Sequence, residues 1–216
     1  MLLFDMDGTL IDSNGVWKDV DRKFLARRGL PYTHAYYQGV AHTILPLAAK
    51  FTKEYCHLAE SCEDIIAEWM AMAKDAYAHV TVKPGVRAYL KQCRAEGRRM
   101  AVVTSSVPEH CRTALTRLDL MKYFEGVTLA HDLGLEKKDP ALWRAAAKTY
   151  GVAPEDCTVF DDSLSACGGA RGARMRVVGV YDSFFARDEA AMRGFCDVYI
   201  KSFEELLLPP RREVRP

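Results

Sequence analysis

The chain opens with Met1-Leu2-Leu3-Phe4-Asp5-Met6-Asp7-Gly8-Thr9-Leu10-Ile11-Asp12-Ser13, in which an apolar run leads into two aspartates and a glycine. This pattern is typical of a short buried strand that ends in a turn. Residues i and i+2 of a strand share a face, so we expect the carboxylates of Asp5 and Asp7 to point into the same space. Carboxylates this close repel each other unless a cation or a shared proton relieves them. Mg²⁺, which prefers oxygen ligands, is the cation that we expect there.

Composition narrows the class of protein. The 216 residues are 49% apolar and 27% charged, which is ordinary for a globular protein with a real core. The net charge of +1, from 30 basic and 29 acidic residues, gives no reason to expect nucleic-acid binding. No apolar run approaches the ~20 residues that span a bilayer, and we expect neither a membrane segment nor a signal peptide. We expect the basic tail at 211–216 to be frayed.

The seven cysteines are scattered and form no Cys-x-x-Cys pair. An odd count without metal-ligand spacing is typical of buried free thiols in a reducing compartment. We therefore expect a cytoplasmic protein without a disulfide framework or zinc site. The sequence does not fix the oligomeric state, and we expect a monomer.

Residues 15–79 show helical periodicity and no strand signal. We expect helices from the Ser13-Asn14 pair to Gly29, over 35–52 and over 63–77. This block is predicted to be a small all-helical domain, inserted between residues 1–14 and 80–216 of a second domain. Residues 13–16 and 79–84 are the expected hinges between the two.

From residue 80 onward, short apolar strands alternate with helices. Expected strands are 100–103, 127–130, 158–160, 176–180 and 197–200, with helices beginning near 84, 108, 140, 164, 187 and 203. Ser106 and Ser163 are expected to cap the helices that follow them. This alternation predicts an α/β fold with a doubly wound, Rossmann-like parallel sheet. Ligands of such sheets bind beyond the carboxyl ends of the strands.

Polar residues follow three of these apolar strands. Asp5 follows the first strand, Thr104 follows Val102-Val103, and Asp161-Asp162 follow Val159-Phe160. A hydroxyl at a strand end, followed by backbone amides, can bind phosphate oxygens. Adjacent carboxylates at a strand end suggest a metal site. We expect all three strand ends to converge on one crevice.

These motifs, in this order, resemble those of the haloacid dehalogenase superfamily in its phosphatase branch. The opening pattern there is Asp-x-Asp-Gly-Thr/Val-Leu-x-Asp-Ser, so Asp5 corresponds to the nucleophile and Asp7 to the general acid/base. Dehalogenases that attack carbon lack the second aspartate, so Asp7 favours phosphoryl transfer. The resemblance covers residues 1–14 and 80–205, and the helical block lies where this family inserts a cap.

The remaining motifs add candidate residues. Thr104 matches the second motif, with Ser105 and Ser106 as further phosphate contacts. The third motif is often Lys-Pro-x-Pro, and aligning Pro140 with its second proline makes Lys137 the catalytic lysine. The first proline is replaced by Lys138, which leaves Lys138 open as the alternative.

The fourth motif is usually Glu-Asp-Ser, so Asp161 is a shortened first acid. The resemblance implies that Mg²⁺ is held by the Asp5 side chain, the Asp7 backbone carbonyl and Asp162, with Asp161 acting through water. Gly8 and, in the cap, Trp17 complete the expected substrate-binding residues. Trp17 could equally be a core residue of the cap.

The implied activity is Mg²⁺-dependent hydrolysis of a small-molecule phosphate monoester through an aspartyl phosphate. A sugar-phosphate mutase of the family places a histidine where this chain has Trp17, which favours a hydrolase. A phosphonate hydrolase would need a Schiff-base lysine from the cap, and no lysine there stands out. A non-enzymatic phospho-acceptor domain would be about half this length, with its paired acids ahead of the acceptor.

Overall fold

The computed structural model describes residues 1–40 and 45–207. The chain divides into two compact units. Residues 1–13 and the chain from residue 80 form one, here called the sheet unit. Residues 14–79 form the other, here called the helical unit. The predicted frayed tail at 211–216 lies outside the described residues.

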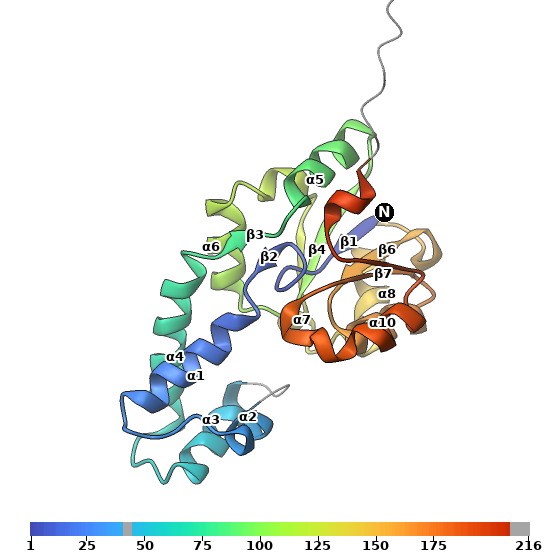
Figure 1. Cartoon of the computed structure of the whole chain (residues 1–216). Helices are drawn as coiled ribbons and strands as arrows, with labels where there is room; N and C mark the ends of the chain where they lie inside the picture. Colours follow the sequence, from blue (N-terminus) through green and yellow to red (C-terminus); the bar gives the residue numbers. More distant parts are fainter. Residues whose placement is uncertain (41–44, 208–216) are drawn as a thin grey trace, which may run out of the picture. The chain divides into compact units, whose positions relative to one another are not determined.

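The sheet unit is built on six parallel strands in the order β5-β4-β1-β6-β7-β8 (Figure 1). The strands are β1 Leu2–Phe4, β4 Met100–Thr104, β5 Val127–Leu129, β6 Thr158–Asp161, β7 Arg176–Val180 and β8 Val198–Ile200. The chain runs outward from β1 through β4 to β5, and on the other side through β6 to β8. β1 is thus the topological switch point, where sheets of this kind bind their ligands. The predicted doubly wound fold is confirmed.

Helices of the sheet unit follow the strands as crossover connections. They are α5 Val86–Ala95, α6 Pro108–Arg117, α7 Ala130–Leu133, α8 Pro140–Thr149, α9 Leu164–Gly172 and α10 Glu189–Phe195. Short 3-10 turns are η1 Met121–Tyr123, η2 Pro154–Asp156, η3 Ser183–Asp188 and η4 Phe203–Leu206. The start of α8 is fixed as predicted, because Asp139 accepts a hydrogen bond from Ala141 N at 2.8 Å and Pro140 occupies the first helical position.

Side chains that alternate along β1 enter two different cores. Leu3 packs in a cluster with Val159 of β6 and with the buried faces of α8 and α9, which include Trp143 and Cys167. Phe4 points the opposite way into an aromatic cluster. That cluster consists of Phe4, Phe160, Tyr89 of α5 and Phe203 of η4, with ring centroids 4.6–6.4 Å apart.

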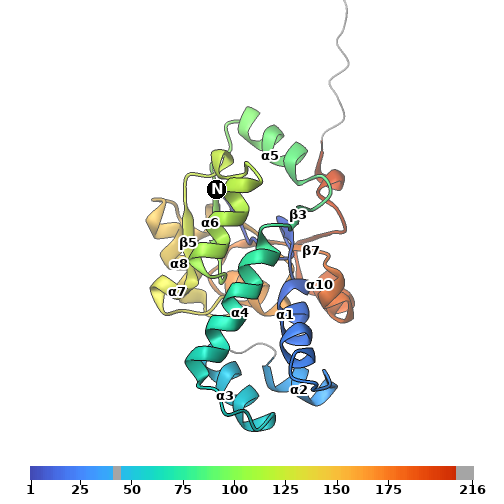
Figure 2. The ribbon, with the colours of Figure 1, turned by 90° about the vertical axis from the view of Figure 1, so that its left-hand side faces the viewer.

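The helical unit contains α1 Gly15–Ala26, α2 His34–Val40, α3 Leu45–Tyr55 and α4 Cys62–Tyr77. Helices α1 and α4 lie side by side, with Phe24 against Trp69 edge-to-face at 5.5 Å (Figure 2). A capping box between Ser61 and Asp64 fixes the start of α4. The helix expected over 35–52 is described as α2 and α3, and residues 41–44 between them lie outside the described residues.

Several local predictions are wrong. The sequence shows no signal for β2 Ile11–Asp12 and β3 Thr81–Val82, which pair antiparallel, because two-residue strands are too short for a periodic pattern. Ala130 begins α7 instead of ending a strand. Val107, not Ser106, occupies the cap position of α6. Ser163 does occupy the cap position of α9, as predicted, but its side chain makes no cap hydrogen bond.

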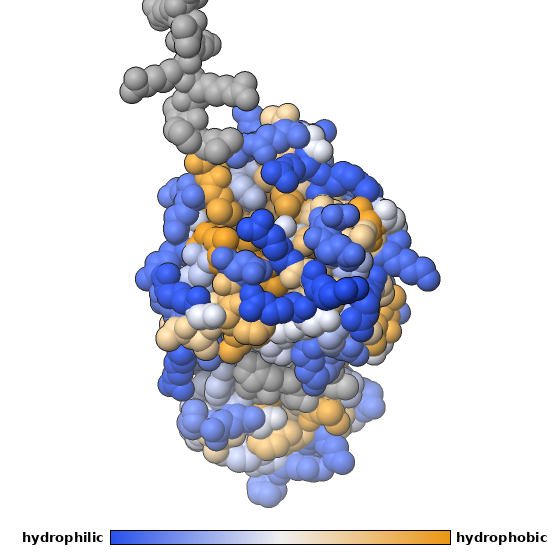
Figure 3. Space-filling view, turned by 90° about the vertical axis from the view of Figure 1, so that its right-hand side faces the viewer, coloured by the Kyte–Doolittle hydropathy of each residue, from blue (hydrophilic) through white to orange (hydrophobic). Residues whose placement is uncertain are grey.

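The surface is mixed in character. On the face that Figure 3 shows, hydrophilic side chains are interspersed with smaller hydrophobic areas. Among the described residues, no helix has both the length and the apolar character needed to cross a membrane.

Truncation of Phe203 tests whether η4 belongs to the core. Phe203 is 1% exposed and touches three other rings, so Phe203→Ala is expected to lower the free energy of unfolding by about 3–5 kcal/mol. Met121, 39% exposed, is the matched control, and Met121→Ala is expected to cost less than about 0.5 kcal/mol. Urea unfolding measures both. A loss below about 1 kcal/mol for Phe203→Ala would contradict its place in the core.

Candidate active site

Three aspartates meet at the carboxyl edge of the sheet, beside the switch point. Asp5 directly follows β1, and its N–H donates to the carbonyl of Phe160 at 2.9 Å, which places Asp5 beside Asp161 at the end of β6. The side chains of Asp5, Asp161 and Asp162 are buried, and one carboxylate oxygen from each lies within 4.8 Å of the others. The sequence predicted this convergence of strand ends.

Lys137 lies among these carboxylates. Its Nζ is 2.6 Å from Oδ1 of Asp5 and 2.7 Å from Oδ2 of Asp161. The lysine that precedes α8 is held by its backbone, because its carbonyl accepts a hydrogen bond from Trp143 Nε1 at 2.7 Å. Gly169 of α9 makes this approach possible, since a Cβ there would lie 2.1 Å from the Lys137 carbonyl oxygen.

Lys138 takes a different position from its neighbour. Its ammonium pairs with Glu136 at 2.5 Å, and its side chain is 68% exposed against 13% for Lys137. Of the two lysines that the third motif left open, only Lys137 therefore contacts the aspartate cluster in the described part of the chain.

The cluster contains three carboxyl groups and one ammonium group, and this imbalance shifts their pKa values. Burial raises the pKa of Asp5 to about 7, and the carboxylates of Asp161 and Asp7 add to the rise although Lys137 lowers it. Burial and the charges of Asp5 and Asp161 likewise raise the pKa of Asp162. Burial lowers the pKa of Lys137, but Asp161 and Asp5 outweigh it and raise that pKa above its ordinary value.

One ammonium thus faces three buried carboxylates. This imbalance is what a divalent cation would correct, and carboxylate oxygens are the ligands that hard cations prefer. Asp5, Asp161 and Asp162 could hold such an ion.

Asp7 lies on a turn beyond β1, which ends at Phe4, so strand alternation does not explain how Asp7 comes near Asp5. The turn does so instead. Gly8 takes the left-handed conformation at φ 79° and donates its N–H to the carbonyl of Ile11 at 2.8 Å. Ser13 Oγ donates to Oδ1 of Asp7 at 2.6 Å, which fixes that carboxylate.

Thr104, the last residue of β4, is fully buried. Its Oγ1 accepts a hydrogen bond from Ser106 N at 3.0 Å, so the hydroxyl hydrogen is directed elsewhere and can be donated to a ligand. Ser105 is exposed and Ser106 is half-buried. Trp17 is half-buried on α1 of the helical unit, and its substrate role remains a prediction.

Two contacts in this region are not predicted by the sequence. Thr9 Oγ1 donates to Oδ1 of Asp162 at 3.4 Å, and Ser13 holds Asp7. Both residues lie in the opening stretch of the sequence. Their position close to Asp5 and Asp7 is the feature that could have indicated a role in the site.

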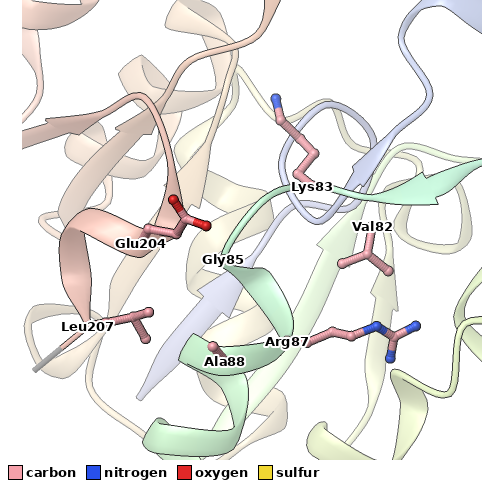
Figure 4. Close-up of a pocket in the computed structure, with 7 residues that line it drawn as sticks. All are labelled: Val82, Lys83, Gly85, Arg87, Ala88, Glu204 and Leu207. Atoms are coloured by element: carbon pink, nitrogen blue, oxygen red, sulfur yellow. The ribbon is translucent and has the colours of Figure 1, made fainter. Parts of the chain in front are cut away.

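A surface hollow of about 340 Å³ lies away from these aspartates. Figure 4 shows it between the start of α5 and η4, with lining residues Val82, Lys83, Gly85, Arg87, Ala88, Glu204 and Leu207. None of the lining residues belongs to the aspartate cluster. The candidate active site is therefore located by the cluster of aspartates and Lys137 at the topological switch point, and not by this hollow.

Comparison with known families identifies the class of protein. The sequence profile described as "Haloacid dehalogenase-like hydrolase" matches residues 2–180. The chain belongs to this family. It is thus a haloacid dehalogenase-like hydrolase, which confirms the resemblance drawn from its four motifs.

Relatives of this hydrolase include named phosphatases. A phosphoglycolate phosphatase from Nitrosococcus oceani is 30% identical over 185 residues, covering 82% of each chain. A phosphorylated carbohydrates phosphatase from Thermotoga maritima is 27% identical over 184 residues, covering 84% of this chain and 85% of its own. The crystal structure of CbbY from Rhodobacter sphaeroides in complex with phosphate has the same fold, with a TM-score of 0.79, 21% identity and 95% coverage of both chains.

The adjacent lysines give a matched test of the hydrolase's charge cluster. Lys137→Met leaves buried carboxylates without their cation and is expected to cost about 3–5 kcal/mol of unfolding free energy near pH 8. Lys138→Met removes an exposed pair and is expected to cost less than about 1 kcal/mol.

The pH dependence has a definite sign. The folded protein holds the Asp5 proton more tightly than the unfolded chain does, with a pKa of about 7 against 3.8. That contribution to stability is complete below pH 3.8 and is lost as pH rises through about 7. Because Lys137 lowers this pKa, the loss in Lys137→Met should be larger near pH 8 than near pH 5. Urea unfolding in EDTA measures this, and an equal loss at both pH values would contradict the account.

Proposed function

We propose that this hydrolase is a Mg²⁺-dependent phosphatase that cleaves a small-molecule phosphate monoester through an aspartyl phosphate on Asp5. The observation that carries the proposal is the bridge from Lys137 to Asp5 and Asp161 at the switch point of the sheet. An anionic nucleophile and an anionic phosphate approach each other only where positive charge is already in place.

In the first step a carboxylate oxygen of Asp5 attacks phosphorus and forms the new bond as the bond to the leaving oxygen breaks. Asp7 donates its proton to that oxygen, so the product leaves as an alcohol. In the second step Asp7 takes a proton from water, whose oxygen attacks phosphorus. Phosphate is released and the Asp5 carboxylate is restored. Ser13 keeps Asp7 in place for both transfers.

Lys137 and Thr104 stabilise the transferring group. The ammonium holds Asp5 in position and offsets the charge that accumulates on the phosphoryl oxygens, and the Thr104 hydroxyl can donate to one of them. Phosphoryl transfer depends mainly on positioning and charge. The side chains of Asp5 and Asp162 and the Asp7 backbone carbonyl would hold Mg²⁺, with Asp161 acting through water. The bound ion would neutralise charge on the nucleophile and the phosphate.

The substrate is proposed to be a small phosphorylated compound such as a sugar phosphate, the class named for the relative from Thermotoga maritima, so that the leaving group is the corresponding alcohol. The helical unit is proposed to be the cap that contacts and selects the substrate, with Trp17 as one contact residue. Trp17 stands where a mutase of the family has histidine, which favours transfer to water over transfer to a second sugar hydroxyl.

Replacement of the nucleophile is the direct test of the proposal. Asp5→Asn is expected to lower phosphate release from p-nitrophenyl phosphate, and from a panel of sugar phosphates, by at least about 1,000-fold. The control is Asp132→Asn, the same change at a side chain that is 64% exposed, and it should keep wild-type turnover. Turnover that survives in Asp5→Asn would rule the mechanism out.

Metal binding has a readout apart from activity. Mg²⁺ is expected to stabilise the folded protein by about 2.7 kcal/mol when its free concentration is about 100 times its Kd. Differential scanning fluorimetry with and without EDTA measures the shift. Asp162→Asn should lose most of the Mg²⁺-dependent rise in melting temperature, and Asp132→Asn should keep all of it. A wild-type melting temperature that does not respond to Mg²⁺ would contradict the proposed cofactor.

A further inference from the structure

Lys83 is a nearly buried lysine that the mechanism above does not use. It follows β3 directly, and its side chain is 12% exposed. Its Nζ donates to the carbonyls of Gly8 and Tyr181, each at 2.6 Å, and to Oδ2 of Asp182 at 2.8 Å. An ammonium group has three hydrogens, so every donor of Lys83 is used. Figure 4 shows the side chain extending toward the N-terminal loop and away from Leu207.

Asp182 is equally constrained. It lies just beyond β7 and is 5% exposed. Its second oxygen, Oδ1, accepts the N–H of Phe184 at 2.9 Å. Because both carboxylate oxygens have fixed partners, Asp182 holds the ammonium of Lys83 in one place. The charge of Asp182 also reaches the aspartate cluster, where it helps to raise the pKa of Asp162 after burial, Asp5 and Asp161.

The chain segment that Lys83 holds is the turn that carries Asp7. The backbone N–H of Lys83 donates to the carbonyl of Leu10 at 3.1 Å, and the Lys83 side chain binds the carbonyl of Gly8. Gly8 directly follows Asp7 in the chain. Asp7 therefore lies between two anchors, which are the Lys83 ammonium on Gly8 and the Ser13 hydroxyl on its own carboxylate.

We propose that Lys83, held by Asp182, is a positioning residue that fixes the turn carrying Asp7 and thereby sets the rate of both proton transfers. The inference rests on the proposed function, since it needs Asp7 as the acid and base. A misplacement of about 1 Å in a reacting group can cost about 100-fold in rate. Lys83 touches no reacting atom, and its effect passes through the Gly8 carbonyl.

The two chemical steps respond differently to a misplaced Asp7, and p-nitrophenyl phosphate separates them. Nitrophenolate leaves without a proton, so the first step does not need Asp7 as an acid. The second step still needs Asp7 as a base. Lys83→Met is therefore expected to lower kcat by about 10- to 100-fold. Because kcat/KM reports only the steps up to nitrophenolate release, it should change less than about threefold, so KM should fall together with kcat. Stopped-flow absorbance should show a burst of about one nitrophenolate per active site before the slow steady state.

Two partner variants and a control sharpen the test. Asp182→Asn should show the same slowed second step, and the double variant should be no slower than Lys83→Met alone, because the two residues act as one unit. Arg99→Met breaks an exposed ion pair with Glu125 in the same unit and should keep wild-type kcat. If Lys83→Met does not fold, Lys83→Arg, which retains the charge but not three compact donors, is expected to show the burst with a smaller loss.

The outcomes are distinct. A purely structural role would reduce burst amplitude and steady-state rate together, leaving the rate per active site unchanged, and would overturn the inference. So would a wild-type kcat in Lys83→Met. If the wild-type protein releases no phosphate, or Asp5→Asn remains active, the proposed function itself fails and the inference falls with it.

Discussion

One buried ammonium group, that of Lys137, bridges the carboxylates of Asp5 and Asp161 at the centre of the sheet edge. Two carboxylates at the ends of neighbouring strands would repel each other at this depth, where burial already penalises each charge. The lysine makes their approach possible but does not neutralise the cluster, since Asp162 adds a third charge. The remaining negative charge is what prepares the site for a metal ion, and the ammonium is what prepares Asp5 for an anionic substrate.

The fold holds this arrangement with parts that lie far apart in the sequence. Strand β1 lies between β4 and β6, so the switch point brings Asp5, Thr104 and Asp161 to one edge. The lysine reaches them from the loop before α8, where the Trp143 indole and the bare backbone of Gly169 fix its main chain. The same strategy recurs beside Asp7, whose turn is held by Ser13 from one side and by Lys83 from the other.

The sequence predicted the sheet and its strand ends well, because apolar runs that stop at a carboxylate or a hydroxyl carry a strong local signal. It favoured Lys137 through the position of Pro140 but left Lys138 open, because what separates the two lysines is the packing around them. Strands β2 and β3 could not be predicted, because a strand of two residues is too short to show an alternating pattern. The bond from Lys83 to Asp182 spans 99 residues, and no local pattern links the two. Residues that contact the reacting groups were thus easier to predict than the residues that hold them in place.

The central claim is that Asp5 accepts the phosphoryl group before water does. The most direct measurement is the stereochemical course at phosphorus with a phosphorothioate monoester made chiral by two oxygen isotopes and hydrolysed in water that carries the third isotope. Two successive in-line displacements, first by Asp5 and then by water, each invert the configuration. The account therefore predicts net retention in the released thiophosphate. Net inversion would mean a single direct attack by water and would contradict the role given to Asp5.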